Sequence, residues 1–140
     1  MLTNARIEDV MTRSPHSVGA DQTVDFARSV MRGFRIRHLP VLQAGRLVGL
    51  LSERDIYWIE SLKDGDGGKM LVEQAMTPAP YAVAPDALLA DVAREMAERK
   101  YGSAVVMDGD KVVGLFTSTD ALSALAALLV VPRPPARTLQ

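Results

Sequence analysis

The chain contains no cysteine, so it can form neither a disulfide nor a thiolate metal site. Aromatic residues make up only 5% of its 140 residues, and there is a single tryptophan. Neither positive nor negative charge dominates, because the chain has 16 Lys and Arg residues and 17 Asp and Glu residues, for a formal net charge of −1. Such a balance gives no support to duplex DNA or an acidic membrane as a partner, so no nucleic acid is expected.

Long apolar runs are also missing. The most apolar stretch, ALSALAALLVV at residues 121–131, is well short of the roughly 18 apolar residues that span a bilayer. The start of the chain, MLTNARIEDVM, lacks the apolar core of a signal peptide. Together with the lack of cysteine, these features predict a cytoplasmic protein without a membrane span.

The residue patterns of common catalytic sites are absent as well. The chain has no P-loop, no G-x-S-x-G segment and no His-centred triad. Its two histidines, His16 and His38, lie far apart in sequence and have no cysteine companions, which argues against zinc. We therefore expect neither an enzyme nor a metal site, and no required cofactor.

What the chain does contain is a repeat with a constant offset of 65 residues. Met11-Thr12 matches Met76-Thr77, and the segment VGLLSERD (Val48–Asp55) matches VGLFTSTD (Val113–Asp120) without a gap. The pattern predicts a tandem duplication. Its parts are repeat 1 at residues 1–62, a Gly-rich linker at 63–69, repeat 2 at 70–130, and a Pro-rich tail at 131–140 that is expected to be disordered or to bind a partner.

Each repeat predicts the element order β-α-β-β-α. An extended piece around Val18 or Val83 leads to Asp21 or Asp86, which we interpret as a helix N-cap. An amphipathic helix follows, with Gly33 as the expected end of the first one. Two short apolar runs joined by a tight turn, Asp-Gly in the second repeat, then lead to a last helix. One unit of this size cannot bury both faces of its sheet, so two α+β units should pack together.

This ordered set of motifs resembles the cystathionine β-synthase (CBS) domain. The first repeat carries DVMT, RHLPVL and VGLLSERD, and the second carries QAMT, YGSAVVMDGDKVVG and LFTSTD. The resemblance spans roughly Ile7 to Leu129, which favours a stand-alone CBS pair. It implies two β-α-β-β-α units packed about a pseudo-two-fold axis. It also implies two related clefts for an adenosine-containing ligand, namely AMP, ADP, ATP, S-adenosylmethionine or NAD.

The family resemblance also implies a regulatory module, which senses such a ligand and acts on an unknown client protein or on its own oligomeric state. Pairs of this kind form a homodimer, a flat disc of four CBS units. Tyr57 and Trp58 sit on a predicted helix where aromatic residues belong to the core or to a subunit interface, and we favour the interface. The alternative function is a dimerisation and interaction scaffold that binds no ligand.

The repeated Ser/Thr-x-x-Asp motif has two compatible interpretations. In the first, it is a capping box that starts a helix, although such boxes prefer Glu or Gln to Asp. In the second, the carboxylate accepts hydrogen bonds from ribose hydroxyls while the Ser or Thr and the helix N-terminus meet phosphate. The preceding glycines, Gly49 and Gly114, would let a ligand approach the backbone. The candidate ligand residues of the motif are Ser52 and Asp55, and Thr117 and Asp120.

The two repeats differ where phosphates would bind. Repeat 1 has Arg37 and His38, which supply charge-assisted donors, whereas repeat 2 has Gly102 and Ser103 at the matching positions. By resemblance to the gamma subunit of AMP-activated protein kinase, Arg37 and His38 would contact phosphate. A solvated basic edge strand is the alternative. A cleft with Gly102 and Ser103 suits a less charged ligand, or none.

The Met-Thr segments complete the candidate sites. The resemblance places Thr12 and Thr77 where family members enclose the adenine. His16 and Tyr81 occupy matched positions nearby, where an aromatic ring either stacks on the base or packs on the protein surface.

Overall fold

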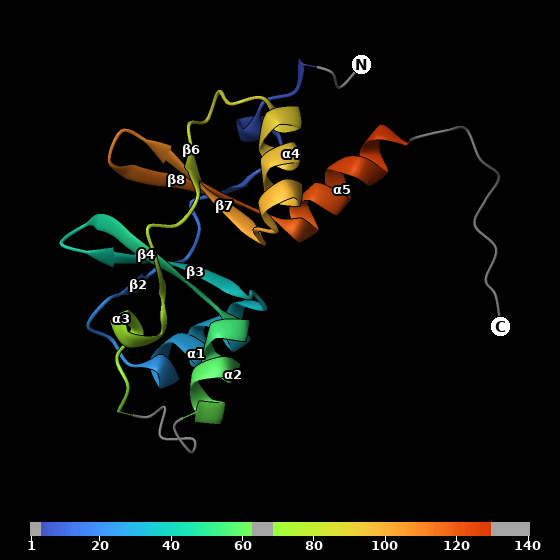
Figure 1. Ribbon diagram of the computed structural model, residues 1–140. Helices are drawn as coiled ribbons and strands as arrows, with labels where there is room; N and C mark the ends of the chain where they lie inside the picture. The colour runs from blue at the N-terminus through green and yellow to red at the C-terminus, as the bar shows by residue number, and fades with distance from the viewer. Residues whose placement is uncertain (1–3, 63–68, 130–140) are drawn as a thin grey trace, which may run out of the picture.

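The computed structural model describes residues 4–62 and 69–129, which form an α+β structure with two four-stranded sheets (Figure 1). Positions 63–68 of the predicted linker and the whole predicted tail, 131–140, lie outside the described residues.

The first repeat has the predicted order. It consists of β2 (Val18–Gly19), α1 (Val24–Phe34), β3 (His38–Gln43), β4 (Arg46–Ser52) and α2 (Glu53–Leu62). Strand β2 runs parallel to β3, as a strand-helix-strand crossover requires, and β3 and β4 form an antiparallel hairpin.

The second repeat has the same order. Its elements are β6 (Ala82–Val83), α4 (Leu89–Arg99), β7 (Ser103–Asp108), β8 (Lys111–Thr117) and α5 (Ser118–Leu128). The predicted Asp-Gly turn joins β7 to β8, with Gly109 at a φ of 63°, a conformation that glycine adopts readily.

The leading segment of each repeat, which precedes its β-α-β-β-α elements, pairs with the sheet of the other repeat. Strand β1 (Thr12–Arg13) pairs with β8, and β5 (Thr77–Pro78) pairs with β4, so the sheet orders are β1-β8-β7-β6 and β2-β3-β4-β5. The short 3₁₀-helix at Ile7–Asp9, dark blue in Figure 1, accordingly lies beside α4, and α3 (Val72–Ala75) packs against α1 and α2. The two repeats are therefore interlocked.

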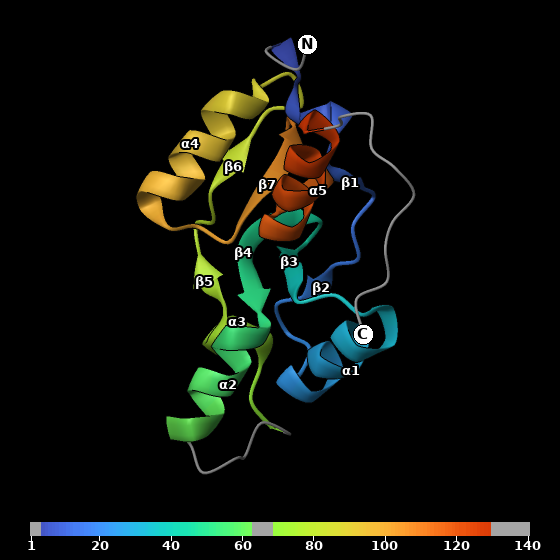
Figure 2. The same cartoon turned by 90° about the vertical axis from the view of Figure 1, so that its right-hand side faces the viewer.

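Both sheets are covered on both faces. The central strands β3 and β7 each bury at least three consecutive residues, a pattern typical of strands packed between two layers. A helix covers one face with residues spaced at three and four, such as Val24, Ala27 and Met31 of α1. Figure 2 shows the two repeats meeting along the middle of the molecule, where β4 contacts β8. The expectation that two copies pack together is confirmed.

The predicted helix boundaries were wrong in two respects. Asp21 and Asp86 are not N-caps, because the helices begin later, at Val24 and Leu89. The cap of α1 is Thr23, whose hydroxyl accepts a hydrogen bond from the N–H of Phe26 at 3.1 Å, and the N-cap residue of α4 is Leu88, which makes no side-chain capping bond.

Gly33 does not end α1 either. The helix continues through Phe34 and ends at Arg35, whose φ of 57° is left-handed. The N–H groups of Arg35 and Ile36 both bond the carbonyl of Met31, so the backbone closes the helix without a glycine. Lys100 ends α4 in the same way.

Each crossing segment packs a methionine against a glycine of the sheet that it joins. A Cβ built on Gly49 would collide with the side chain of Met76, and one on Gly114 would collide with that of Met11. These glycines admit a side chain from the other repeat, so the expectation that a ligand approaches the backbone there was wrong.

We predict that Gly49→Ala lowers the free energy of unfolding by about 2 kcal/mol, the usual cost of overpacking. Its new methyl group would meet Met76 and also the carbonyl oxygen of Thr77 at 2.9 Å. Gly114→Ala costs less, since the three atoms nearest its new methyl group all belong to the flexible side chain of Met11. Urea denaturation measures both losses.

Gly33→Ala is the matched control. No heavy atom lies within 4 Å of a Cβ built there, and the residue is inside α1, so higher helix propensity raises stability by up to about 1 kcal/mol. A gain of stability from Gly49→Ala, or equal changes of stability from Gly33→Ala and Gly49→Ala, would contradict the packing argument.

Candidate functional site

The two Ser/Thr-x-x-Asp motifs begin the helices that follow the sheet hairpins. The N–H of Ser52 donates to Oδ2 of Asp55 at 2.9 Å, and Oγ of Ser52 accepts from the N–H of Asp55 at 3.0 Å. Thr117 and Asp120 repeat this reciprocal pattern, at 3.0 Å and 3.3 Å. The motif is therefore a capping box in both repeats, with Asp in the place usual for Glu. The predicted ribose contact is compatible with this, because the backbone bond of each box uses only Oδ2 of the carboxylate.

Four predicted residues lie near Asp55, and together with it they form what we call the Asp55 site: Arg37, His38, Ser52, Asp55 and Thr77. His38 faces Ser52 across the β3–β4 hairpin, and the carbonyl of Arg37 accepts the N–H of Glu53 at 2.9 Å. Thr77 lies opposite Leu50 on the edge of the same sheet, so the second repeat's leading segment contributes to this site.

The other five form the Asp120 site: Thr12, Gly102, Ser103, Thr117 and Asp120. Ser103 is buried and faces Thr117 across the β7–β8 hairpin. The carbonyl of Gly102 accepts from the N–H of Ser118 at 3.1 Å. The hydroxyl of Thr12 lies 3.3 Å from Oδ1 and 3.4 Å from Oδ2 of Asp120, to which it donates.

The two sites adjoin at His38 and Gly102. A Cβ on Gly102 would lie 3.5 Å from Nε2 of His38, which is an ordinary contact distance. The imidazole therefore stands at the border between the two groups of residues. Sequence reasoning had not brought these two residues together, because they belong to different repeats.

His38 is more neutral than an ordinary histidine. Burial lowers its pKa, the carboxylate of Asp55 opposes that shift, and the guanidinium of Arg37 adds to it. Arg37, by contrast, is exposed and carries a permanent charge. An anion placed between the two would be bonded by Arg37 and would favour protonation of His38.

The low pKa of His38 makes stability depend on pH. Because the folded pKa lies below the unfolded value of 6.5, protonation favours the unfolded chain. The contribution of His38 to the free energy of unfolding is therefore highest above about pH 6.5, falls as the pH drops from there towards the folded pKa, and levels off below it. We predict that His38→Gln flattens this dependence between about pH 7.5 and about pH 5, as measured by urea unfolding at several pH values. Parallel pH profiles for the parent and the variant would contradict the assignment.

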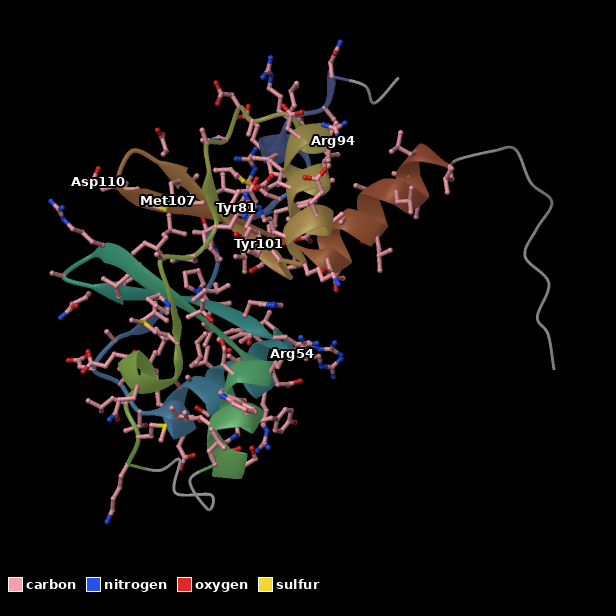
Figure 3. The ribbon with its side chains drawn as sticks, in the orientation of Figure 1. Arg54, Tyr81, Arg94, Tyr101, Met107 and Asp110 are labelled. Atoms are coloured by element: carbon pink, nitrogen blue, oxygen red, sulfur yellow. The ribbon has the colours of Figure 1, made fainter. Side chains whose placement is uncertain are left out.

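The aromatic rings at the matched positions pack on the protein. His16 stacks on Phe34 with ring centroids 3.6 Å apart, and Tyr81 lies 5.2 Å from Tyr101 (Figure 3). Of the two interpretations of these residues, packing is the one that the side-chain positions favour. His16 and Tyr81 lie in the connections that follow β1 and β5, and their partners lie at the end of α1 (Phe34) and just beyond the end of α4 (Tyr101).

The last helix of each repeat leaves large apolar side chains uncovered. In α2, Tyr57 and Trp58 are 63% and 64% exposed, so they do not belong to the core of the chain. Helix α5 has no buried residue, and Figure 1 shows it extending away from the sheets. Its exposed leucines are Leu122, Leu125 and Leu128, and Leu129 follows directly.

The part of the chain that the structure describes supports neither a membrane-spanning helix nor a metal site. None of the helices in residues 4–62 and 69–129 has the length and apolar character that crossing a bilayer requires. Within the same ranges, no three His, Cys, Asp or Glu side chains gather as metal ligands would.

Comparison with protein families identifies the architecture. The CBS domain family matches the chain twice, at residues 7–59 and 72–127, which together make up most of its length. The chain belongs to the CBS domain family, as a tandem pair of CBS domains.

Relatives of known name carry this pair in different contexts. Inosine-5′-monophosphate dehydrogenase of Korarchaeum cryptofilum is 34% identical over 115 residues, which are 81% of this chain, but the chain spans only 22% of that enzyme. The CBS domain-containing protein YhcV of Bacillus subtilis is 27% identical over 114 residues, and the match covers 81% of each protein.

A solved structure links the fold to a ligand in another protein. CBSX2 of Arabidopsis thaliana, in complex with AMP, superimposes with a TM-score of 0.75 at 27% identity, covering 88% of this chain and 97% of that one.

Proposed function

We propose that the chain is a regulatory module, not an enzyme, that binds an adenosine-containing ligand and alters a client protein or its own assembly. The observation that carries the proposal is the Asp55 site. There a carboxylate with an unused oxygen, a helix N-terminus and the Arg37–His38 pair lie together at one end of the β3–β4 hairpin. The AMP complex of the related CBSX2 supports the choice of ligand class.

Each group in this site matches a part of AMP. The unused Oδ1 of Asp55 suits a ribose diol, because a carboxylate accepts two hydroxyl hydrogen bonds. The guanidinium of Arg37, the imidazole of His38 and the N-terminus of α2 suit the phosphate. Thr77, on the crossing strand, would border the adenine. AMP, ADP, ATP and NAD fit these basic residues better than S-adenosylmethionine, which carries no phosphate.

Regulation would follow from the interlocked fold. Asp55 belongs to the first repeat and Thr77 to the segment that leads the second, so a ligand in the Asp55 site touches both. A ligand that binds one relative arrangement of the repeats more tightly shifts the population towards it. The client protein would respond to that shift.

Binding of AMP is the first test. At 100 times its dissociation constant, AMP should add about 2.7 kcal/mol of stability and raise the melting temperature by a few degrees. Asp55→Asn keeps an oxygen for the capping bond but removes the charge, and should weaken AMP binding at least about tenfold. Calorimetric titration measures the dissociation constant.

Asp110→Asn, at the exposed tip of the β7–β8 hairpin, is the matched charge control and should bind as the parent does (Figure 3). If AMP, ATP, NAD and S-adenosylmethionine all leave the melting temperature unchanged, the ligand-free scaffold is the better function. If AMP binds but neither Asp55→Asn nor Asp120→Asn weakens it, the ribose assignment is wrong.

We further propose that a second copy of this chain covers the exposed faces of α2 and α5, giving a disc of four CBS units. Both repeats expose large apolar side chains on their last helix, and matched faces of this kind suit a symmetric, self-complementary contact. Helix α5 in particular has an apolar face too large for a free surface helix.

Leu122→Glu should convert the dimer into a monomer, since it places a charge in the middle of an apolar contact. Sedimentation equilibrium measures the mass, and circular dichroism checks that the fold persists. Ala90→Glu, on the exposed surface of α4, is the matched control and should remain dimeric. A parent that sediments as a monomer at about millimolar concentration would rule out the dimer, since the dissociation constant of the dimer would then exceed about 1 mM.

A further inference from the structure

The two acidic residues of the repeated motif are bonded differently. In both, Oδ2 accepts a backbone N–H of the capping box. Asp120 also accepts the hydroxyl of Thr12, at 3.3 Å to Oδ1 and 3.4 Å to Oδ2, and the hydroxyl of Thr117 at 3.2 Å. Among residues 4–62 and 69–129, no side chain donates to Asp55, and Thr77, the counterpart of Thr12, makes no such bond.

The difference matters because the ligand would need the same oxygens. A carboxylate offers a limited number of lone pairs, and a ribose hydroxyl at Asp120 must compete with a hydroxyl that already points there. At Asp55 the competing partner would be water alone. The Thr12 contact is long for an O–H donor, whose usual distance is about 2.7–2.8 Å, so the competition is modest in strength.

We propose that the hydroxyl of Thr12 is an internal competitor for the Asp120 carboxylate, so that the two sites bind adenosine-containing ligands with unequal affinity. This inference rests on the proposed function. AMP fills the Asp55 site first, and the Asp120 site fills only when Thr12 turns away. The neutral Gly102 and Ser103 act in the same direction, since they offer the phosphate no charge.

The competition also couples the second site to the start of the chain. Thr12 lies on β1, which is held on β8 by two residue pairs and by the contact of Met11 with Gly114. A ligand at Asp120 replaces one bond between β1 and α5. Occupancy of this site is thereby linked to how firmly the N-terminal segment is held on the second repeat.

The test uses Thr→Val substitutions, which keep the side-chain shape and remove the hydroxyl. In an Asp55→Asn background AMP binding at the Asp55 site is weakened, and Thr12→Val should tighten AMP binding at the Asp120 site about threefold, the effect of one weak hydrogen bond. In an Asp120→Asn background, the matched Thr77→Val should give no gain, because Thr77 does not bond Asp55. Both threonines are exposed on two-residue edge strands, so the comparison is fair. Calorimetric titration with AMP measures each dissociation constant.

The sign of the effect decides the inference. If Thr12 instead contacts the ligand, Thr12→Val weakens AMP binding, and either weaker or unchanged binding overturns the proposal. A gain of similar size at Thr77→Val would also overturn it, since the effect would then not come from the bond to Asp120.

A measurement without ligand separates this inference from the proposed function. In thermal unfolding, the losses of unfolding free energy caused by Thr12→Val and Asp120→Asn should be less than additive in the double variant. The losses of unfolding free energy caused by Thr77→Val and Asp55→Asn should add. Additive losses in both pairs would overturn the Thr12–Asp120 bond even if AMP binds. If AMP does not bind even the parent chain, the proposed function fails and the competition fails with it, even where the ligand-free measurement shows that Thr12 and Asp120 are coupled.

Discussion

The structure depends on a reciprocal exchange between its two repeats. Met11 packs against Gly114 and Met76 against Gly49, so the segment that leads each repeat is fixed on the sheet of the other. Backbone bonds support the exchange, since Val24 donates to the carbonyl of Met70 and Ile7 to that of Ala87. Neither sheet has its full four strands without the other repeat, which is why a unit of this size folds as a pair.

The same exchange builds the candidate site. The carboxylate of Asp55 alone would be an ordinary helix cap, as its reciprocal bonds with Ser52 show. The crossing strand adds Thr77 beside it, and the neighbouring strand adds Arg37 and His38. A ligand bound as proposed would touch both repeats, so its binding energy would change how they are arranged. The proposed regulation would therefore follow from how the fold is assembled.

Much of the fold could be predicted from the sequence, because the 65-residue repeat indicated the element order of both repeats and the Asp-Gly turn indicated one hairpin. The crossing could not, since a constant offset relates the copies without saying which sheet a strand joins. Thr12 and Asp120 are 108 residues apart yet bonded. Gly33 was a misleading signal, because backbone bonds to Met31 end the helix at Arg35 instead. The ligand-binding roles remain predictions.

A crystal structure of the chain grown with AMP tests the central claim most directly. The account predicts AMP in the Asp55 site, with the ribose hydroxyls on the carboxylate of Asp55 and the phosphate within hydrogen-bonding distance of Arg37 and His38. Contacts with Thr77 would show that the ligand touches both repeats. AMP bound elsewhere, or bound in this site with the carboxylate of Asp55 bonded only to its own helix, would contradict it.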